Sequence, residues 1–212
     1  MSARLRVALL ALGWITLAGL DDPSSVERGV LAELNRIRAD PQGYAEELAE
    51  YRRGFEGKVA LLSDGSELMT TEGPPAVDEA IAFLRWQKPA GPLAPSHVLA
   101  KAAQSFAGEQ ARSGAVGHRS ADGALPPDRV KRAGGDIYVA ETIAYGPSKA
   151  RDIARQFIVD DGVRGRGHRA LVFRDEYHFA GVGCGPHPVW RYMCVVDYAA
   201  TPEGRPQLPV KK

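Results

Sequence analysis

The chain has 212 residues, a quarter of them charged, and its formal net charge is +1. This length suits one globular domain with a sizeable core, together with a short tail. The near-neutral charge argues against a nucleic-acid partner, because no excess of basic residues is available to displace the counterions of a phosphate backbone. A local basic run, Arg164, Arg166 and Arg169, is interpreted as a solvated loop.

Residues 1–20 have the pattern of a secretory signal peptide. Arg4 and Arg6 form a short positive region, and the run from Val7 to Leu20 is almost wholly apolar. This run is short for a bilayer span, although an uncleaved membrane anchor is the alternative. Nothing later in the chain has the pattern of a transmembrane segment. We therefore expect a protein that is secreted, with an extracellular or periplasmic location.

Apolar residues at helical spacing predict helices through the first half of the chain. The first follows the capping-box pair Ser24 and Glu27, and the second opens at Asp40-Pro41. A third is expected over 77–87. The fourth begins at Ser96 and ends at Gly114, and small alanines on its apolar stripe would let it approach a sheet closely. The segment 54–86 includes one possible short strand, at 59–62, and no role can be assigned to it.

Strand patterns dominate the second half of the chain. Apolar β runs at 179–185 and 192–199 flank a turn, and 139–145 is expected to add a further strand. Both faces of this hairpin are apolar, so helices must cover it above and below. The expected fold class is therefore α+β, a three-layer α-β-α sandwich with a central antiparallel sheet. Between the strands, Ser148 is predicted to cap a long helix, and residues 201–212 are expected to form a flexible tail.

Cys184 and Cys194 are the two cysteines of the chain. A turn centred on Val189 places them directly opposite each other in the hairpin, close enough for a disulfide. An exported protein tolerates such a bond, whereas reduced buried thiols are the alternative. Two cysteines cannot form a cysteine-rich zinc site, so any metal ion must rely on nitrogen and oxygen ligands.

Three residues of ligand type lie in loop-like or glycine-bearing contexts, namely His118, Glu141 and His168. Imidazole titrates near neutrality and is a common metal ligand, so paired loop histidines with an acid between them suggest a site. Asp160 prolongs the apolar face of a helix, and an acid at such a position needs a partner or a cavity. A carboxylate that meets solvent at the helix end is the alternative for Asp160, and Asp161 competes for the same role.

Several motifs resemble the CAP superfamily of cysteine-rich secretory, antigen and pathogenesis-related proteins. They are Gly167-His168-Arg169, Gly181-Val182-Gly183, Met193-Cys194-Val195 and the segment around Glu141, and they look most like the bacterial SCP-like extracellular branch. The resemblance runs over 24–200. It implies an α-β-α sandwich with a central cavity lined by two histidines and two acids, which correspond here to His118, Glu141, Asp160 and His168.

This sequence departs from the family pattern at two positions of that cavity. Ala140-Glu141-Thr142 stands where the family has Gly-Glu-Asn, and Asp160 stands where the family has a glutamate. The aspartate is shorter by one methylene, which puts a four-ligand geometry in doubt. The remaining histidines, His97, His178 and His187, lie at a helix start or at strand ends and are not expected to be ligands.

The resemblance implies a binding module without established catalysis. Its expected ligand is a divalent metal such as Zn²⁺, a lipid or sterol, or an extracellular protein partner. A metal-dependent or acid–base hydrolase that uses the same cavity is the alternative, although the HExxH spacing of zinc proteases and the GxSxG nucleophile elbow are both absent. A third interpretation is a structural extracellular domain in which the two histidines only form hydrogen bonds.

Overall fold

The computed structural model describes residues 25–207, so the expected signal peptide at 1–20 lies outside the described residues. The helices are α1 (Ser25–Ala39), α2 (Pro41–Arg53), α3 (Pro74–Trp86), α4 (His97–Ser113), α5 (Pro126–Arg132), α6 (Ala150–Val159) and α7 (Gly167–Val172). The strands are β1 (Val59–Leu61), β2 (Glu67–Met69), β3 (Ala94–Pro95), β4 (Val139–Tyr145), β5 (Phe179–His187) and β6 (Arg191–Ala199). Within the described range, no helix combines the length and apolarity that crossing a membrane requires.

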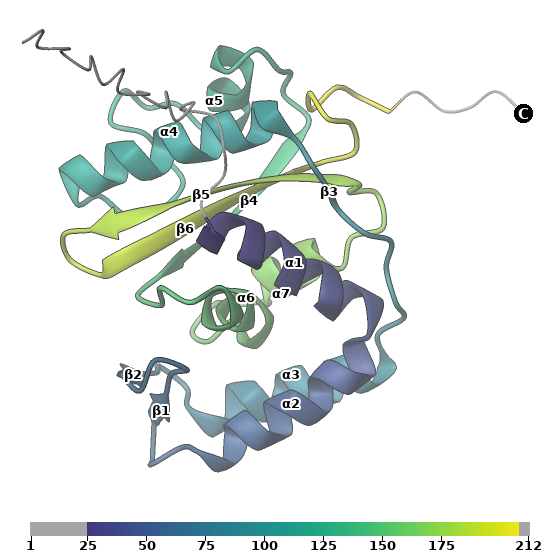
Figure 1. Ribbon diagram of the computed structural model, residues 1–212, viewed down its shortest axis with the longest axis vertical. Helices are drawn as coiled ribbons and strands as arrows, with labels where there is room; N and C mark the ends of the chain where they lie inside the picture. Colours follow the sequence, from purple (N-terminus) through teal and green to yellow (C-terminus); the bar gives the residue numbers. More distant parts are fainter. Residues whose placement is uncertain (1–24, 208–212) are drawn as a thin grey trace, which may run out of the picture.

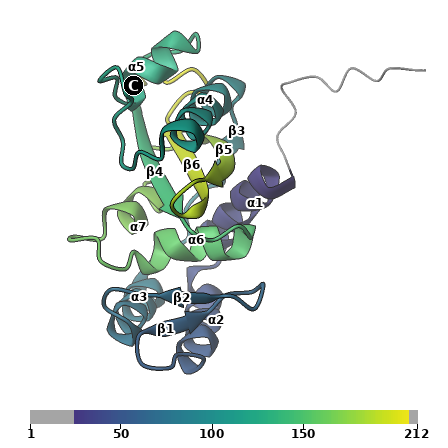
Figure 2. The same ribbon diagram turned by 90° about the vertical axis from the view of Figure 1, so that its left-hand side faces the viewer.

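The main sheet has the strand order β3-β5-β6-β4, in which β5, β6 and β4 pair antiparallel and the two-residue β3 pairs parallel to β5. Helices α4 and α5 cover one face of this sheet, and α1, α6 and α7 lie on the other (Figure 1). The fold is therefore the expected α+β, three-layer α-β-α sandwich. Beyond α6, the helices α2 and α3 and the small β1–β2 hairpin form a further group, seen at the bottom of Figure 2.

Glycines on β5 allow α4 to lie directly against the sheet. A Cβ atom built on Gly181 would lie 2.0 Å from the backbone nitrogen of Ala100, and one on Gly183 would lie 2.2 Å from that of Gln104. On the same face, Phe106 of α4 packs with Met193 and Val195 of β6. The alanine stripe of α4 and the glycines of β5 thus together produce the close approach that the sequence indicated.

The β5–β6 hairpin has the predicted register. Cys184 pairs directly with Cys194, and the two form a disulfide. The two cysteines share a face of the hairpin with Val182, Val196 and Tyr198, which lie in the large core cluster that also includes residues of α1 and α6. Both hairpin faces are therefore covered, as their apolar composition requires.

Two helix starts differ from the sequence prediction. Helix α3 begins at Pro74 rather than 77, because proline suits the first turn of a helix, where its missing N–H would have had no partner. The prediction that Ser148 caps α6 was wrong: Lys149 occupies the N-cap, and no side chain caps this helix.

Two arginines of the basic run differ from its prediction as a solvated loop, whereas Arg164 is exposed in the turn before α7, as predicted. Arg169 lies in α7 and is buried, with Nε donating to Ile158 O at 2.6 Å and Nη2 donating to Val159 O at 2.9 Å. Arg166 pairs with Glu72 and Glu79 of the N-terminal segment. Arg169 therefore donates to carbonyls at the end of α6, which have no partner within the helix. Arg166 links the turn before α7 to α3 through Glu79.

The tail expected over 201–212 begins with residues that hydrogen-bond to the domain. The backbone nitrogen of Asp136 donates to Glu203 O at 2.7 Å, and that of Tyr138 donates to Gly204 O at 2.9 Å. These bonds attach the start of the tail to the segment that leads into β4. Residues 208–212 lie outside the described part of the chain.

Substitution of a β5 glycine tests the contact with α4. Gly183→Ala places a methyl group within the backbone of α4 and should lower the free energy of unfolding by about 1–3 kcal/mol, because the helix must shift. Gly185→Ala is the matched control on the same strand, since a Cβ there meets nothing within 4 Å. Urea denaturation of the two variants measures the difference. Equal stability of both would contradict the close approach.

Candidate functional site

His118 is held by a carboxylate that the sheet buries. Helix α4 ends at Gly114, whose left-handed backbone (φ 69°) turns the chain toward His118. The Nδ1 atom of His118 lies 2.7 Å from Oε1 of Glu141 on β4. The Glu141 side chain is 1% exposed, whereas that of His118 is 46% exposed. A carboxylate only accepts hydrogen bonds, so Nδ1 carries the proton of a neutral His118 and Nε2 keeps its lone pair.

Arg129 of α5 supports the same pair from behind. Its Nη2 donates to Oε2 of Glu141 at 2.5 Å, and its Nη1 donates to the backbone oxygen of His118 at 2.9 Å. The guanidinium lies over the ring of Phe106, 3.5 Å from its centroid. Arg129 therefore compensates the buried charge of Glu141. It also fixes the backbone position of His118, which keeps the imidazole within hydrogen-bond distance of Glu141.

His168 has an equivalent partner in Asp160. Asp160 ends α6 in the left-handed conformation (φ 55°), and its Oδ1 lies 2.7 Å from Nδ1 of His168. Its Oδ2 accepts a hydrogen bond from the backbone nitrogen of His168 at 2.9 Å, so the carboxylate also caps α7, whose own N-cap residue Arg166 offers no side-chain acceptor. The Asp160 side chain is fully buried. The solvent-facing alternative for Asp160 is therefore wrong.

Asp161 does not contact an imidazole but binds the backbone of the segment before α3. Its two carboxylate oxygens accept hydrogen bonds from the backbone nitrogens of Thr71, at 2.5 Å, and Glu72, at 2.8 Å. It thus ties the segment before α3 to the end of α6, while Asp160 alone turns inward to an imidazole. Sequence could not separate these adjacent acids, because the choice depends on which one adopts the left-handed cap conformation.

The two imidazoles share one hollow, which we call the histidine cavity. Their ring centroids lie 6.5 Å apart, and both rings line a cavity of about 240 Å³. Asp160 also lines it, together with Ile143, Tyr145 and Gln156. Glu141 does not line it but lies behind His118. The structure therefore brings together all four residues from the sequence analysis, with the carboxylates bound to Nδ1 atoms and both Nε2 atoms left without a hydrogen-bond partner among the described residues.

This arrangement offers a metal ion two nitrogen ligands. Across residues 25–207, no group of three or more His, Cys, Asp or Glu side chains is placed to hold a metal ion. Two imidazoles on one tetrahedral zinc ion, at Zn–N distances of about 2.0–2.1 Å, have centroids roughly 5 Å apart. His118 and His168 therefore fit a shared ion if the rings approach by about 1 Å, and water or a bound molecule completes the shell.

The other histidines lie away from this cavity, as expected. His187 is buried at the β5–β6 turn, where its Nε2 lies 3.0 Å from Ala115 O and its Nδ1 accepts from the backbone nitrogens of Val189 and Trp190. It therefore stabilises the turn. His97 and His178 are exposed.

Asp197, a buried acid on β6, was missed by the sequence analysis. It pairs with Glu141 across the β4–β6 ladder, and its side-chain oxygens have no hydrogen-bond partner in the described structure. Burial raises the pKa of the Asp197 carboxyl well above its ordinary value, and the negative charge of Glu141 raises that pKa further. The raised pKa favours the protonated, uncharged form of Asp197 beside Glu141.

A pattern in the sequence pointed to Asp197. It is the acidic residue within the apolar run 192–199, on the same face as Met193 and Val195, and such an acid must be partnered or neutral. Arg129 gave no comparable signal, because the short helix α5 contains two prolines and no apolar periodicity. Its role depends on a contact between side chains that only the folded chain brings together.

Asp197→Asn tests the neutral state of this acid. Because the folded pKa is raised, the unfolded chain releases this proton first, so the wild type loses stability as pH rises above about 4. The asparagine does not ionise. The free energy of unfolding of the variant relative to the wild type should therefore increase with pH, by up to about 1.4 kcal/mol per pH unit. Denaturation at a series of pH values measures this, with the exposed Asp175→Asn as control. A difference that is constant with pH would contradict the assignment.

Comparison of this chain with known proteins identifies the family to which it belongs. The family model described as the cysteine-rich secretory protein family, CAP, matches residues 78–198, more than half of the chain. A search of curated proteins finds no match. An outer surface protein from Borrelia burgdorferi is 14% identical, with a TM-score of 0.43, over 51% of this chain and 77% of that one.

An extracellular protein containing an SCP domain, from Bacillus anthracis, is 18% identical with a TM-score of 0.42. The match covers 59% of this chain and 37% of that protein, so this chain spans little more than a third of its length. The family match, in contrast, includes the four cavity residues and both cysteines. This chain belongs to the CAP family of cysteine-rich secretory proteins.

Proposed function

We propose that this protein is an exported binding module whose histidine cavity binds a divalent metal ion such as Zn²⁺. The observation that supports this is the hydrogen-bonding pattern that the two imidazoles share. Each Nδ1 is bound to a buried carboxylate, and each Nε2 has no partner among the described residues, at rings that line one cavity. The Nε2 atoms of His118 and His168 would hold the ion. The bound ion would supply a coordination position for an oxygen- or nitrogen-bearing ligand.

Glu141 and Asp160 act on the imidazoles rather than as ligands themselves. A carboxylate at Nδ1 fixes the tautomer and the ring orientation, and it makes Nε2 a more basic ligand. Both oxygens of each carboxylate already take part in a hydrogen bond, one with an imidazole Nδ1 and the other with Arg129 or the backbone nitrogen of His168. The shorter side chain of Asp160 is compatible with this role, because the left-handed cap brings its Oδ1 to 2.7 Å from His168 Nδ1.

Export is part of the proposal. It is supported by the signal-peptide pattern at 1–20 and by the Cys184–Cys194 disulfide, a bond that persists in oxidising compartments. The hydrolase and the purely structural domain stay alternatives that no observation favours. The lipid, sterol and protein partners implied by the family stay predictions.

Calorimetric titration with ZnCl₂ tests the metal site. The wild type should bind one ion, and His118→Ala or His168→Ala should weaken binding by about tenfold or more, because each variant removes one of two ligands. His178→Ala is the matched control, since His178 is exposed and lies outside the cavity. Absence of binding to the wild type, or equal binding by all variants, would contradict the proposal.

Glu141→Gln tests the orienting role of the carboxylate. The amide keeps the shape of the side chain but removes its charge, so zinc affinity should fall by about 10–100-fold while both imidazoles remain. The same titration measures it, with circular dichroism to verify the fold. Unchanged affinity would show that Glu141 does not orient His118.

A further inference from the structure

Three acceptors that lack a hydrogen-bond partner belong to side chains that line the histidine cavity. Two are the Nε2 atoms of His118 and His168, which have no partner among the described residues. The third is Oε1 of Gln156, which is buried without a partner, whereas Nε2 of this residue donates to Tyr145 O at 3.1 Å. A buried acceptor without a partner costs free energy that a donor on a ligand would recover. The cavity therefore offers three acceptors to one ligand.

The histidine cavity is also negatively charged. Asp160 and Asp161 both line it, and no lysine or arginine is among its described lining residues. Both carboxylates accept hydrogen bonds from backbone nitrogens, and neither forms an ion pair with a lysine or arginine within residues 25–207. Glu141 lies behind the cavity, where Arg129 balances its charge. An anionic ligand would therefore meet like charges in the cavity, whereas a cation would be attracted.

The separation of the two imidazoles fits a cation that donates hydrogen bonds. Two rings that accept through Nε2 from one tetrahedral ammonium group, at N···N distances of about 2.9 Å, have centroids roughly 6–7 Å apart. The centroids of His118 and His168 lie 6.5 Å apart. A shared zinc ion requires a shorter separation, of roughly 5 Å. An ammonium group therefore fits between the two rings without movement of either ring.

A second and larger hollow lies beside the histidine cavity, and we call it the hairpin pocket. Its volume is about 530 Å³, within the range of about 300–1,000 Å³ that is usual for small-molecule sites. Gly117, Tyr145, Gln156 and Asp161 line both hollows, so the two are neighbours. The body of a ligand whose ammonium group lies between the imidazoles therefore has space in the hairpin pocket.

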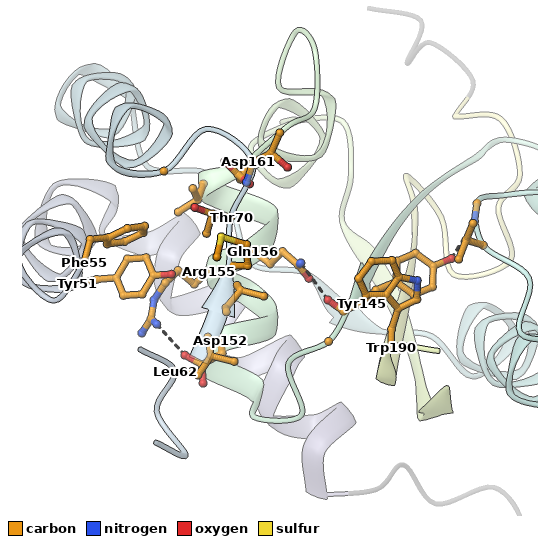
Figure 3. Close-up of a pocket in the computed structure, with 18 residues that line it drawn as sticks. Tyr51, Phe55, Leu62, Thr70, Tyr145, Asp152, Arg155, Gln156, Asp161 and Trp190 are labelled. Carbon is orange, nitrogen blue, oxygen red and sulfur yellow. Dashed lines mark hydrogen bonds and ion pairs between the residues drawn. The ribbon is translucent and has the colours of Figure 1, made fainter. Parts of the chain in front are cut away.

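The hairpin pocket has aromatic walls from distant parts of the chain. Figure 3 shows Tyr51 and Phe55 on one side and Tyr145 and Trp190 on the opposite side. Trp190 is 50% exposed, so its ring offers surface to a ligand. Aromatic rings gain free energy from offset-stacked and edge-to-face contacts with one another, beyond the burial of their area. The walls therefore favour a ligand with an aromatic body.

The β1–β2 hairpin is a fixed part of this pocket. The backbone nitrogen and hydroxyl of Ser63, in the β1–β2 turn, both donate to Oδ2 of Asp152, in the first turn of α6. At the other end of α6, Asp161 binds the backbone of Thr71 and Glu72. The hairpin precedes residue 78, where the family match begins. This part of the pocket therefore comes from the segment for which the sequence indicated no role.

We propose that the two hollows together bind a primary arylalkylamine, an aromatic ring joined by a short alkyl chain to a protonated amino group. The ammonium group donates one N–H to Nε2 of His118, one to Nε2 of His168 and one to Oε1 of Gln156. The aromatic ring lies in the hairpin pocket against Trp190. The amine uses the same imidazoles as the proposed metal ion but needs no metal, so the two ligands exclude each other.

Calorimetric titration of the metal-free protein at pH 8 with four indole compounds tests this proposal. Tryptamine should bind saturably, with one molecule per chain. Tryptophol has a hydroxyl in place of the amino group, and N,N,N-trimethyltryptammonium keeps the charge but has no N–H donor on its cationic nitrogen. Each should bind about tenfold or more weakly than tryptamine, because it loses charge-assisted hydrogen bonds to the three acceptors. Indole-3-propionate should bind most weakly, since its carboxylate meets Asp160 and Asp161. Failure of tryptamine to bind, or equal binding of the trimethylated cation, would overturn the proposal.

Gln156→Met separates this proposal from the metal site. The variant removes one acceptor of the ammonium group, so tryptamine affinity should fall by about tenfold, whereas zinc affinity should stay unchanged because Gln156 is not a proposed zinc ligand. Gln104→Met is the matched control, since Gln104 lines neither hollow. Zinc binding without tryptamine binding would overturn this proposal alone, and tryptamine binding without zinc binding would overturn the metal site alone.

A matched pair of variants locates the aromatic ring. Trp190→Ala should weaken tryptamine binding by about tenfold, whereas Val189→Ala should not, because the exposed Val189 lies outside the pocket. Thermal unfolding verifies that each variant stays folded. Equal tryptamine affinity within this pair and within the glutamine pair would place the amine elsewhere and overturn the proposal.

Discussion

The candidate site depends on one interaction that occurs twice, the hydrogen bond between an imidazole Nδ1 and a carboxylate that the fold has removed from water. Both bonds are 2.7 Å long, and both carboxylates are almost fully buried. A buried charge needs compensation. Glu141 receives it from Arg129, and Asp160 receives it from backbone donors at the start of α7. Each imidazole is therefore fixed through its Nδ1 atom, and its Nε2 atom is left for a ligand.

Helix α6 connects this site with the rest of the molecule. Its apolar face belongs to the main core, and its C-terminal cap, Asp160, orients His168. The acids Asp152 and Asp161, at its two ends, bind the hairpin that forms the outer wall of the neighbouring pocket. A single helix thus positions a polar site on one side and an apolar pocket beside it. The two hollows are adjacent because they share this helix.

The sequence predicted the parts of this structure that depend on local pattern or on register. Apolar spacing placed the first four helices, and the turn at Val189 placed Cys184 opposite Cys194. Loop context indicated His118, Glu141 and His168, and the family resemblance grouped them with Asp160 around one cavity. The structure brings the four together. The roles within that group were not predictable, because the separation of Asp160 from Asp161 depends on one backbone conformation.

Contacts between distant side chains explain most of what the sequence did not predict. Arg129 and Asp197 complete the surroundings of Glu141, yet each comes from another element, and only the pairing in the fold shows which acid they adjoin. The buried state of Arg169 depends on carbonyls at the end of α6. Likewise, the segment 54–86 is attached to the two ends of α6 through Ser63 and Thr71, and no local sequence pattern predicts these contacts.

The tautomers of His118 and His168 test the central claim most directly. Nitrogen-15 NMR of the imidazole rings, on metal-free protein above pH 8, distinguishes a protonated Nδ1 from a protonated Nε2. Because each Nδ1 donates to a carboxylate, the neutral rings should both carry their proton on Nδ1, with Nε2 unprotonated. Protonation of Nε2 in either ring would contradict the account, since that nitrogen would then have no lone pair to offer a ligand.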